Sequence, residues 1–334
     1  MSIFDQKVIK YEMKPLSSLE KVFPDETPVY RMECQMLSGL WGETVSFQVA
    51  YTGDFVMRER LDVRVVSELA EHVHVRTVEM VPVGRATNGI VDDNYLKTTS
   101  GLYPDLLKDL KDGKVIVYSR QWRSLWVDVD ITNEIPAGEY EIELQLIKEG
   151  EVVCSAKQKV TVIGTELPKL DIMHTEWMHA DCLADYYHVE VFSEEHWKLL
   201  ENYFQEYVKR DCNMMLTSLF TSPLDTAIGL ERTTCQLIDV EVKDGEYVFG
   251  FEKLKRWIDL CKKCGIEYFE MSHLFSQWGA KYAPKVVATV NGKKEKIFGW
   301  HTPAVGEYTK FLESFLPQLT AKLRKWEIAD EIGR

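Results

Sequence analysis

The period of the hydrophobic pattern changes once along the chain, near residues 164–168, and this change constrains the fold more than any other feature. Before it, apolar and polar residues alternate over short runs, which are residues 45–51, 61–65, 73–78, 124–129 and 140–146. Alternation of this kind turns one face of a strand to a core. After it, short apolar runs are separated by stretches with helical spacing. We therefore expect two domains, at residues 1–166 and 167–334.

The first domain is predicted to be a β-sandwich. Its short alternating runs are separated by turn signals, such as residues 136–138 before the run at 140–146. Residues 149–151 predict a hairpin turn into the next strand, at 152–154. Many short strands with regularly spaced turns are typical of two sheets packed face to face.

The second domain reads as three strand–helix units, with strands at residues 169–174, 212–217 and 266–271. The first helix begins after Ser193, a good N-cap, and Phe192 and Trp197 form a hydrophobic staple across it. The second helix ends at Gly265, and the third covers about 305–326. Because strand–helix alternation gives parallel sheets and the loops after the strands are long, we expect part of a (β/α)8 barrel. A complete barrel needs roughly 250 residues, so we expect it to be truncated before strand four.

Charge and composition limit the partners. The chain has 53 acidic and 40 basic residues, a net charge of −13, which disfavours nucleic acid and anionic membranes. No signal peptide and no apolar run of about 18 residues is visible. Seven scattered cysteines fit a reducing compartment, so we expect a cytoplasmic protein of unspecified oligomeric state.

Polar and aromatic side chains gather after the three predicted strands. An indole can cover the apolar face of a sugar, and hydrogen bonds to charged groups, worth about 1.5–3 kcal/mol each, can select its hydroxyls. The carboxyl ends of parallel strands lie at one edge, so we expect these side chains to line one cavity. The substrate-binding candidates are Asp225, Arg232, His273, Gln277, Trp278 and Trp300.

Structural roles compete with these assignments. Asp225 and Arg232 can form a loop salt bridge, Trp278 can be a lid against the sandwich, and one of Glu270 and His273 is expected to be structural. His174, His179 and Asp181 share no strand or helix face, so we expect no metal and no cofactor. The Cys-x-x-Cys at 261–264 has no second pair and reads as helix packing.

Several loop motifs resemble those of glycoside hydrolase family 123. They are Thr-Ser-Pro-Leu-Asp-Thr at 221–226, Ser-His-Leu-Phe-Ser-Gln-Trp-Gly-Ala at 272–280 and Phe-Gly-Trp at 298–300. Tyr-Pro-Asp at 103–105 and Leu-Trp-Val-Asp-Val at 125–129 fit the family's sandwich. The resemblance implies a parent enzyme that is a retaining exo-β-N-acetylgalactosaminidase, in which the substrate's own acetamido group attacks the anomeric carbon.

The resemblance also implies a catalytic pair that this chain lacks. In the family, an adjacent Asp-Glu lies in a His-x-Ser-Asp-Glu-Pro type motif on barrel strand four, and no such motif occurs here. Asp330–Glu331 has no following proline and reads as a solvated helix end. We therefore expect the pair beyond Arg334. The alternative is a non-catalytic carbohydrate-binding or interaction protein.

Overall fold

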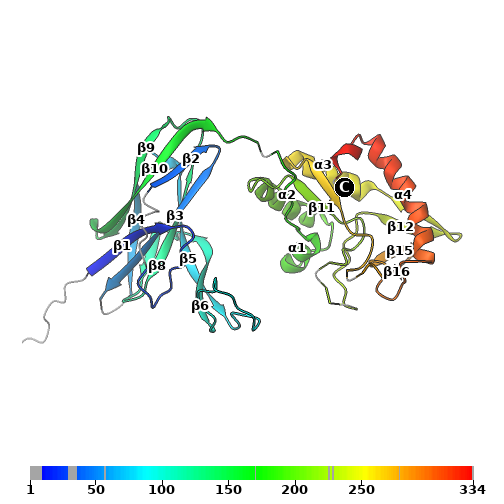
Figure 1. Cartoon of the computed structure of the whole chain (residues 1–334), viewed down its shortest axis with the longest axis horizontal. Coiled ribbons are helices and arrows are strands. Elements are labelled where there is room, and N and C mark those ends of the chain that lie inside the picture. The colour runs from blue at the N-terminus through cyan, green and yellow to red at the C-terminus, as the bar shows by residue number, and fades with distance from the viewer. Residues whose placement is uncertain are drawn as a thin grey trace, which may run out of the picture. The chain divides into compact units, whose positions relative to one another are not determined.

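The computed structural model describes residues 10–28, 36–55, 58–169, 171–224, 226–227, 229–277 and 279–332. The chain divides into two compact units, Met1–Lys169 and Leu170–Arg334. Figure 1 shows strands and no α-helix in the described part of the first unit, and a mixture of helices and strands in the second. Within the described part, no helix is both long and apolar enough to cross a membrane.

The first unit contains two five-stranded sheets with the orders β1-β3-β8-β5-β6 and β2-β10-β9-β4-β7. The strands are β1 (Lys10–Ser17), β2 (Met36–Trp41), β3 (Thr44–Asp54), β4 (Glu59–Val66), β5 (Val73–Val83), β6 (Gly101–Asp109), β7 (Lys114–Val117), β8 (Arg123–Asp130), β9 (Gly138–Lys148) and β10 (Glu151–Glu166). Phe47 and Leu125 from one sheet share a buried cluster with Leu61 and Leu144 from the other. The described sheets therefore have a sandwich-like arrangement around one core, as the alternation predicts.

The hairpin predicted at 149–151 connects β9 to β10. Glu149 and Gly150 both have positive φ, 53° and 89°, which a two-residue turn of the twisted hairpin type requires. Leu144 and Leu146 on β9 are fully buried, whereas Gln145 between them is more exposed. The turn chemistry and the alternation therefore specify the same register.

The second unit contains four α-helices in its described part, with two separate sheets. The helices are α1 (Ala180–Tyr187), α2 (Glu194–Val208), α3 (Glu252–Cys264) and α4 (Glu307–Lys325), and the strands are β11 (Met214–Thr217), β12 (Asp239–Lys243), β13 (Glu246–Gly250), β14 (Tyr268–Met271), β15 (Val286–Val290) and β16 (Lys293–Phe298). Strands β11 and β14 pair in parallel, and the other four form a sheet with the order β13-β12-β15-β16. In Figure 1, α1 and α2 lie to one side of β11 and α4 lies to the other.

The first of the three predicted strands is absent, because the described residues of 169–174 form no strand. The Asn213 side chain replaces much of the expected ladder here. Its Oδ1 accepts from the His174 N–H at 2.8 Å, and its Nδ2 donates to the Ile172 carbonyl at 2.8 Å. The backbone N–H groups of Asn213 and Met214 both donate to the His174 carbonyl at 3.1 Å. The segment therefore runs beside β11 and is held by a side chain and the backbone together, without a regular ladder. Ile332 forms a parallel bridge with Phe269 on the far side of β14.

The predicted helix ends are confirmed. The Ser193 hydroxyl accepts from the His196 N–H at the start of α2, and the Phe192 and Trp197 rings stack with centroids 5.2 Å apart. Gly265 ends α3 in the left-handed conformation with φ 103°. The apolar stripes of α2, α3 and α4 meet in one buried cluster that includes Trp257, as their helical spacing predicts.

Candidate functional site

The segment before α1 is fixed against β11 by two side chains. Besides the Asn213 bonds, the Tyr207 hydroxyl accepts from the Glu176 N–H at 2.7 Å and lies 2.7 Å from the Met214 carbonyl. Burial raises the pKa of Tyr207, so its hydroxyl stays neutral and keeps its donor. These contacts place the following residue, Trp177, beside the carboxyl end of the parallel pair.

Trp177 contacts two side chains near the end of β14. Its indole Nε1 donates to Glu270 Oε2 at 2.9 Å, and its ring meets the His273 ring edge-on, with centroids 5.6 Å apart. Trp177 is 46% exposed and His273 is also exposed. An accessible indole beside a carboxylate and an imidazole can cover a sugar ring and bind its hydroxyls. Glu270 and His273 therefore share one cluster, although the sequence predicts a structural role for one of them.

Arg232 forms an ion pair with an acid other than Asp225, the partner considered from sequence. Its Nε donates to Asp181 Oδ2 at 2.8 Å and its Nη2 to Asp181 Oδ1 at 3.2 Å. The two side chains are 10% and 8% exposed, so the pair is largely desolvated. Asp225, the partner considered from sequence, lies outside the described residues. The Arg232–Asp181 pair ties the loop after β11 to the first turn of α1.

Trp300 follows β16 and contacts the loop that carries Arg232 through a backbone carbonyl. Its Nε1 donates to the Leu230 carbonyl at 2.8 Å, and its ring centroid is 6.3 Å from that of Tyr282. Between them, Glu231 pairs with Lys296 at 2.6 Å, which holds the pKa of Glu231 below its ordinary value. Glu231 is therefore a carboxylate that fixes the loop, rather than an acid holding a proton for transfer.

The remaining candidates lie in the loop after β14. Gln277 is half-buried in a turn, and Trp278 lies outside the described residues. The loop is closed by Ser276, whose N–H donates to the Tyr282 carbonyl at 2.9 Å and whose hydroxyl accepts from the Tyr282 N–H at 3.1 Å. Tyr282 thereby links this loop to Trp300. Among the described candidates, contacts thus connect Arg232 with Trp300, whereas His273 belongs to the Trp177 cluster.

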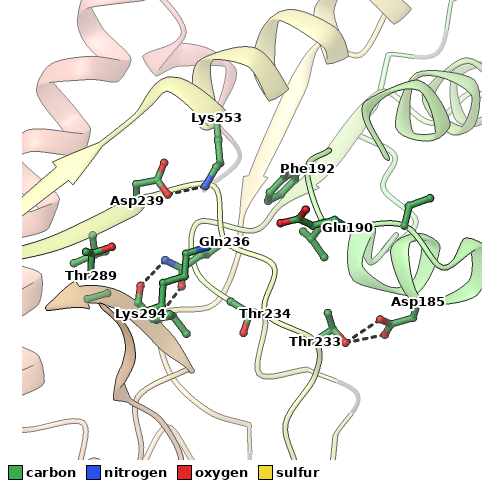
Figure 2. A pocket seen from close by; sticks show the side chains of 15 residues that line it. Asp185, Glu190, Phe192, Thr233, Thr234, Gln236, Asp239, Lys253, Thr289 and Lys294 are labelled. Carbon is green, nitrogen blue, oxygen red and sulfur yellow. Dashed lines mark hydrogen bonds and ion pairs between the residues drawn. The ribbon is translucent and has the colours of Figure 1, made fainter. Parts of the chain in front are cut away.

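A cavity of about 600 Å³ opens beside the loop at 233–236 (Figure 2), at the N-terminal ends of α2 and α3. In a strand–helix unit, those helix ends lie toward the carboxyl ends of the strands. Its walls come from α1, the α1–α2 connection, the loop at 233–236, β12, α3, β15 and β16. None of the described sugar-site candidates is among its lining residues. The volume suits a small ligand.

Most polar groups of this cavity are already paired. Thr233 donates to Asp185 at 2.9 Å, Lys253 pairs with Asp239 at 2.6 Å, and Gln236 donates to the Val287 carbonyl at 2.8 Å. Figure 2 shows Phe192 and Glu190 across the cavity from Thr289 and Lys294. The cavity is therefore a rigid, mixed polar and apolar surface.

Sequence reasoning missed the strands that form one wall of this cavity, although their turns carry a clear signal. Asp244–Gly245 joins β12 to β13, and Asn291–Gly292 joins β15 to β16, with all four residues at positive φ. Asp-Gly and Asn-Gly between alternating residues are strong two-residue hairpin signals. Trp177 was also not singled out, because it follows a segment that pattern alone reads as a strand.

No group of three or more His, Cys, Asp and Glu side chains that could hold a metal ion occurs within the described ranges. His174 instead lies 3.1 Å, through Nδ1, from the Asp211 carbonyl, and Asp181 is engaged by Arg232. Cys261 is buried in α3, where burial raises its pKa, so its thiol packs rather than reacts.

Residues 177–332 match the family model described as glycoside hydrolase 123, catalytic domain. This part of the chain belongs to glycoside hydrolase family 123. A solved structure of a family 123 glycoside hydrolase from Clostridium perfringens, studied for glycolipid glycan hydrolysis, matches with a TM-score of 0.71 at 13% identity. The match covers 97% of this chain and 57% of that one. At this identity it shows the fold alone, and this chain spans little more than half of that family 123 structure.

Weaker structural matches cover half of the chain or less. β-Glucosidase from Listeria innocua with bound glucose has a TM-score of 0.22 at 11% identity, and covers 48% of this chain and 17% of its own. The N-terminal domain of PorA has a TM-score of 0.23 at 10% identity, and the match covers 44% of this chain and 99% of that domain. Neither bears on the fold of the family 123 unit. No curated protein matches the chain.

Proposed function

We propose that the whole protein is a retaining exo-glycosidase that releases terminal β-linked N-acetylgalactosamine. The observation that carries this proposal is the match of residues 177–332 to the family 123 catalytic domain. In the proposed reaction, the substrate's acetamido oxygen attacks the anomeric carbon while the glycosidic bond to the leaving oxygen breaks. An Asp orients the acetamido group, a Glu donates its proton to the leaving oxygen, and water then opens the cyclic intermediate with retention.

We place the Asp-Glu pair on a barrel strand outside residues 1–334, and propose that residues 167–334 form the first part of that barrel. The parallel β11–β14 pair and the parallel bridge from Ile332 to Phe269 support this arrangement. Asp330–Glu331 precedes Ile332, so it lies toward the amino-terminal edge of the strands. Glu331 is also paired with Lys262 at 2.7 Å. This position is opposite to the edge where barrel enzymes place their chemistry.

The residues of this chain would then bind the sugar rather than cleave it. Trp177 offers an exposed indole next to the Glu270 carboxylate and the His273 imidazole, at the carboxyl edge of β14. We propose that Trp278, Gln277 and Trp300 extend this surface from the neighbouring loops, and that Asp225 belongs to it. We propose that Arg232 positions the loop rather than contacting the sugar, because its guanidinium is paired with Asp181.

The test is hydrolysis of p-nitrophenyl β-N-acetylgalactosaminide by the full-length gene product. Release of p-nitrophenol with retained configuration is expected, and release only from a different glycoside would reject the sugar but keep the reaction class. Binding of glycans without hydrolysis of any glycoside would favour the non-catalytic alternative.

The same assay tests the sugar platform. Trp177→Ala and Trp278→Ala should each lower kcat/KM by about tenfold or more, roughly 1.4 kcal/mol of lost transition-state binding. The melting temperature should stay within a few degrees. Tyr186→Ala is the control, because Tyr186 is an aromatic side chain of the same unit and is 76% exposed. A collapsed melting temperature would instead identify the tryptophan as a core residue.

A further inference from the structure

A second cavity, of about 610 Å³, lies within the first unit. Its lining comes from β3, β4, β5, β6, β7 and β8, so both sheets contribute. Strands β6 and β7 are the outermost strands of their respective sheets, and the short turn at 110–113 joins them. The cavity therefore lies at the side of the sheet pair where the two edge strands meet, and every residue that lines it is described.

The lining is basic, although the protein is acidic. Five of the fifteen lining residues are Lys or Arg and two are acidic, whereas the whole chain has a net charge of −13. Two of the five cations are paired with acids that do not line the cavity: Arg60 with Asp112 at 2.9 Å and Lys114 with Asp62 at 2.7 Å. Such a local reversal of sign attracts an anion.

Arg123 is the cation best placed to bind such an anion. Its guanidinium lies over the Tyr118 ring, 5.0 Å from the centroid, which holds the side chain in place. One Nη2 donates to Gln121 at 3.1 Å, while the buried Nε has no acceptor among the described residues. A guanidinium has five N–H donors, so the Nη1 donors and the second Nη2 donor remain for a ligand. An oxyanion that presents two oxygens, such as a carboxylate or a sulfate, matches these donors.

The rest of the cavity favours a ligand that also carries hydroxyl groups. Glu79 lines it and accepts from the Thr77 hydroxyl at 2.8 Å, which leaves further acceptor capacity on the carboxylate. A carboxylate repels a compact dianion but accepts hydrogen bonds from hydroxyls. Tyr51, a buried phenol, and Tyr118 add aromatic surface. The lining therefore combines one site for an oxyanion with acceptors and rings suited to a pyranose.

We propose that this cavity binds an acidic sugar, a pyranose that carries a carboxylate or a sulfate, with Arg123 and Tyr118 as its anchor. The site goes beyond the proposed hydrolysis, because it lies in the first unit and involves no bond cleavage. It gives the protein a second point of attachment to acidic glycans. Both candidate ligands carry an oxyanion on a polyhydroxylated ring. The experiment below distinguishes a carboxylate from a sulfate.

Binding is measured with the full chain by ligand-observed NMR titration, with galacturonate and galactose 6-sulfate as the two acidic probes. At least one is expected to bind about tenfold or more tightly than galactose, acetate or inorganic sulfate, and the tighter one identifies the anion. Affinity should fall as salt is added. Equal binding of galactose, or equal binding of free acetate or sulfate, would overturn the proposal.

Arg123→Gln should weaken the acidic probe about ten- to a hundredfold, as expected for the loss of a charged hydrogen-bonding group. Arg64→Gln is the matched control, because Arg64 is exposed on β4, bonds to Gln145, does not line the cavity and changes the charge equally. That variant should bind within about twofold of the parent. If Arg123→Gln fails to fold, Tyr118→Leu takes its place with the same expected loss. Unchanged affinity in a folded variant would contradict the site.

Discussion

The two units differ in the interactions that stabilise each of them internally. In the first, each strand has at least one neighbour in a five-stranded sheet, and backbone ladders such as the long β9–β10 pairing connect them. In the second, the parallel ladder has only β11 and β14 as full strands. The segments around that ladder are attached by a few backbone bonds, such as those to the His174 carbonyl, and by the side chains of Asp181, Arg232, His196 and Asn213. Loss of one polar side chain should therefore matter more in the second unit.

The first unit also has a polar cluster, but it is redundant. Asp128 accepts from the Ser46 hydroxyl at 2.6 Å and the Trp126 indole at 2.7 Å, and it pairs with Arg76. These residues lie on β3, β8 and β5, which already pair through their backbones. Arg76 is 32% exposed and can turn to water. The cluster thus adds to a connection that exists without it.

The largest expected effect comes from Asp181→Asn. It leaves the Arg232 charge in a site where both side chains are at most 10% exposed, and the loss of one partner of a buried pair costs about 3–5 kcal/mol. The free energy of unfolding should fall by about that much in urea denaturation. Hydrogen exchange should speed up in α1 and the loop at 230–236, while β9 and β10 stay protected.

Two variants serve as controls for this comparison. Arg256→Gln breaks an exposed pair with Glu194 in the same unit and should cost less than about 1 kcal/mol. Asp128→Asn, in the first unit, should cost about 1 kcal/mol because its partner is hydrated. If Asp181→Asn costs no more than these two, the second unit is not held by its side chains as we infer.

The ends of the helices were easier to predict from the sequence than the number of strands in the second unit. Ser193, the Phe192–Trp197 staple and Gly265 act through neighbours in sequence, so their roles can be derived without the fold. Alternation in the first unit succeeded for a related reason: each strand there turns one face to a shared core. Residues 169–174 look equally strand-like, but there the Asn213 side chain shares the hydrogen bonding with the backbone, and no regular ladder forms.

The candidate site was less predictable than the fold. The sequence predicts Asp225, a near neighbour, as the partner of Arg232, but Asp181 lies about fifty residues away and is brought there by α1. Trp177 likewise meets Glu270 from a distant segment. Pairings of this kind depend on loop paths that periodicity does not encode. The Asp-Gly and Asn-Gly turns were readable, since their conformation is local.

The second prediction concerns pH and His196, which is fully buried. Its Nδ1 accepts from the Phe192 N–H at 2.9 Å and its Nε2 lies 3.0 Å from the Ala180 carbonyl, so both nitrogens are used by the neutral ring. Burial lowers its pKa below the ordinary 6.5, although the Ala180 carbonyl and Asp181 oppose this. Below pH 6.5, His196 binds a proton more readily in the unfolded chain than in the folded chain. The free energy of unfolding should therefore fall on acidification.

The measurement is the free energy of unfolding of the second unit between pH 7 and pH 5. In His196→Leu the overall stability is lower, but the His196 contribution to the pH slope should disappear. His188→Asn is the control, because His188 is exposed at the left-handed end of α1, a conformation that asparagine tolerates. An identical slope in His196→Leu and the parent would show that His196 does not titrate as inferred.

The smallest expected effect is at Ser193, whose hydroxyl accepts from the His196 N–H at 3.2 Å. Ser193→Ala removes this acceptor and should cost about 1 kcal/mol, while Ser193→Asp, which restores an N-cap acceptor, should cost little. The Phe192–Trp197 stack remains in both variants, so the difference between them isolates the cap. Urea denaturation measures it, and hydrogen exchange at the first turn of α2 places it. A loss near 3 kcal/mol in Ser193→Ala would mean that the cap also holds His196 in position. The two side chains would then stabilise the start of α2 cooperatively. Equal stability of the alanine and aspartate variants would show that the staple alone fixes the start of α2.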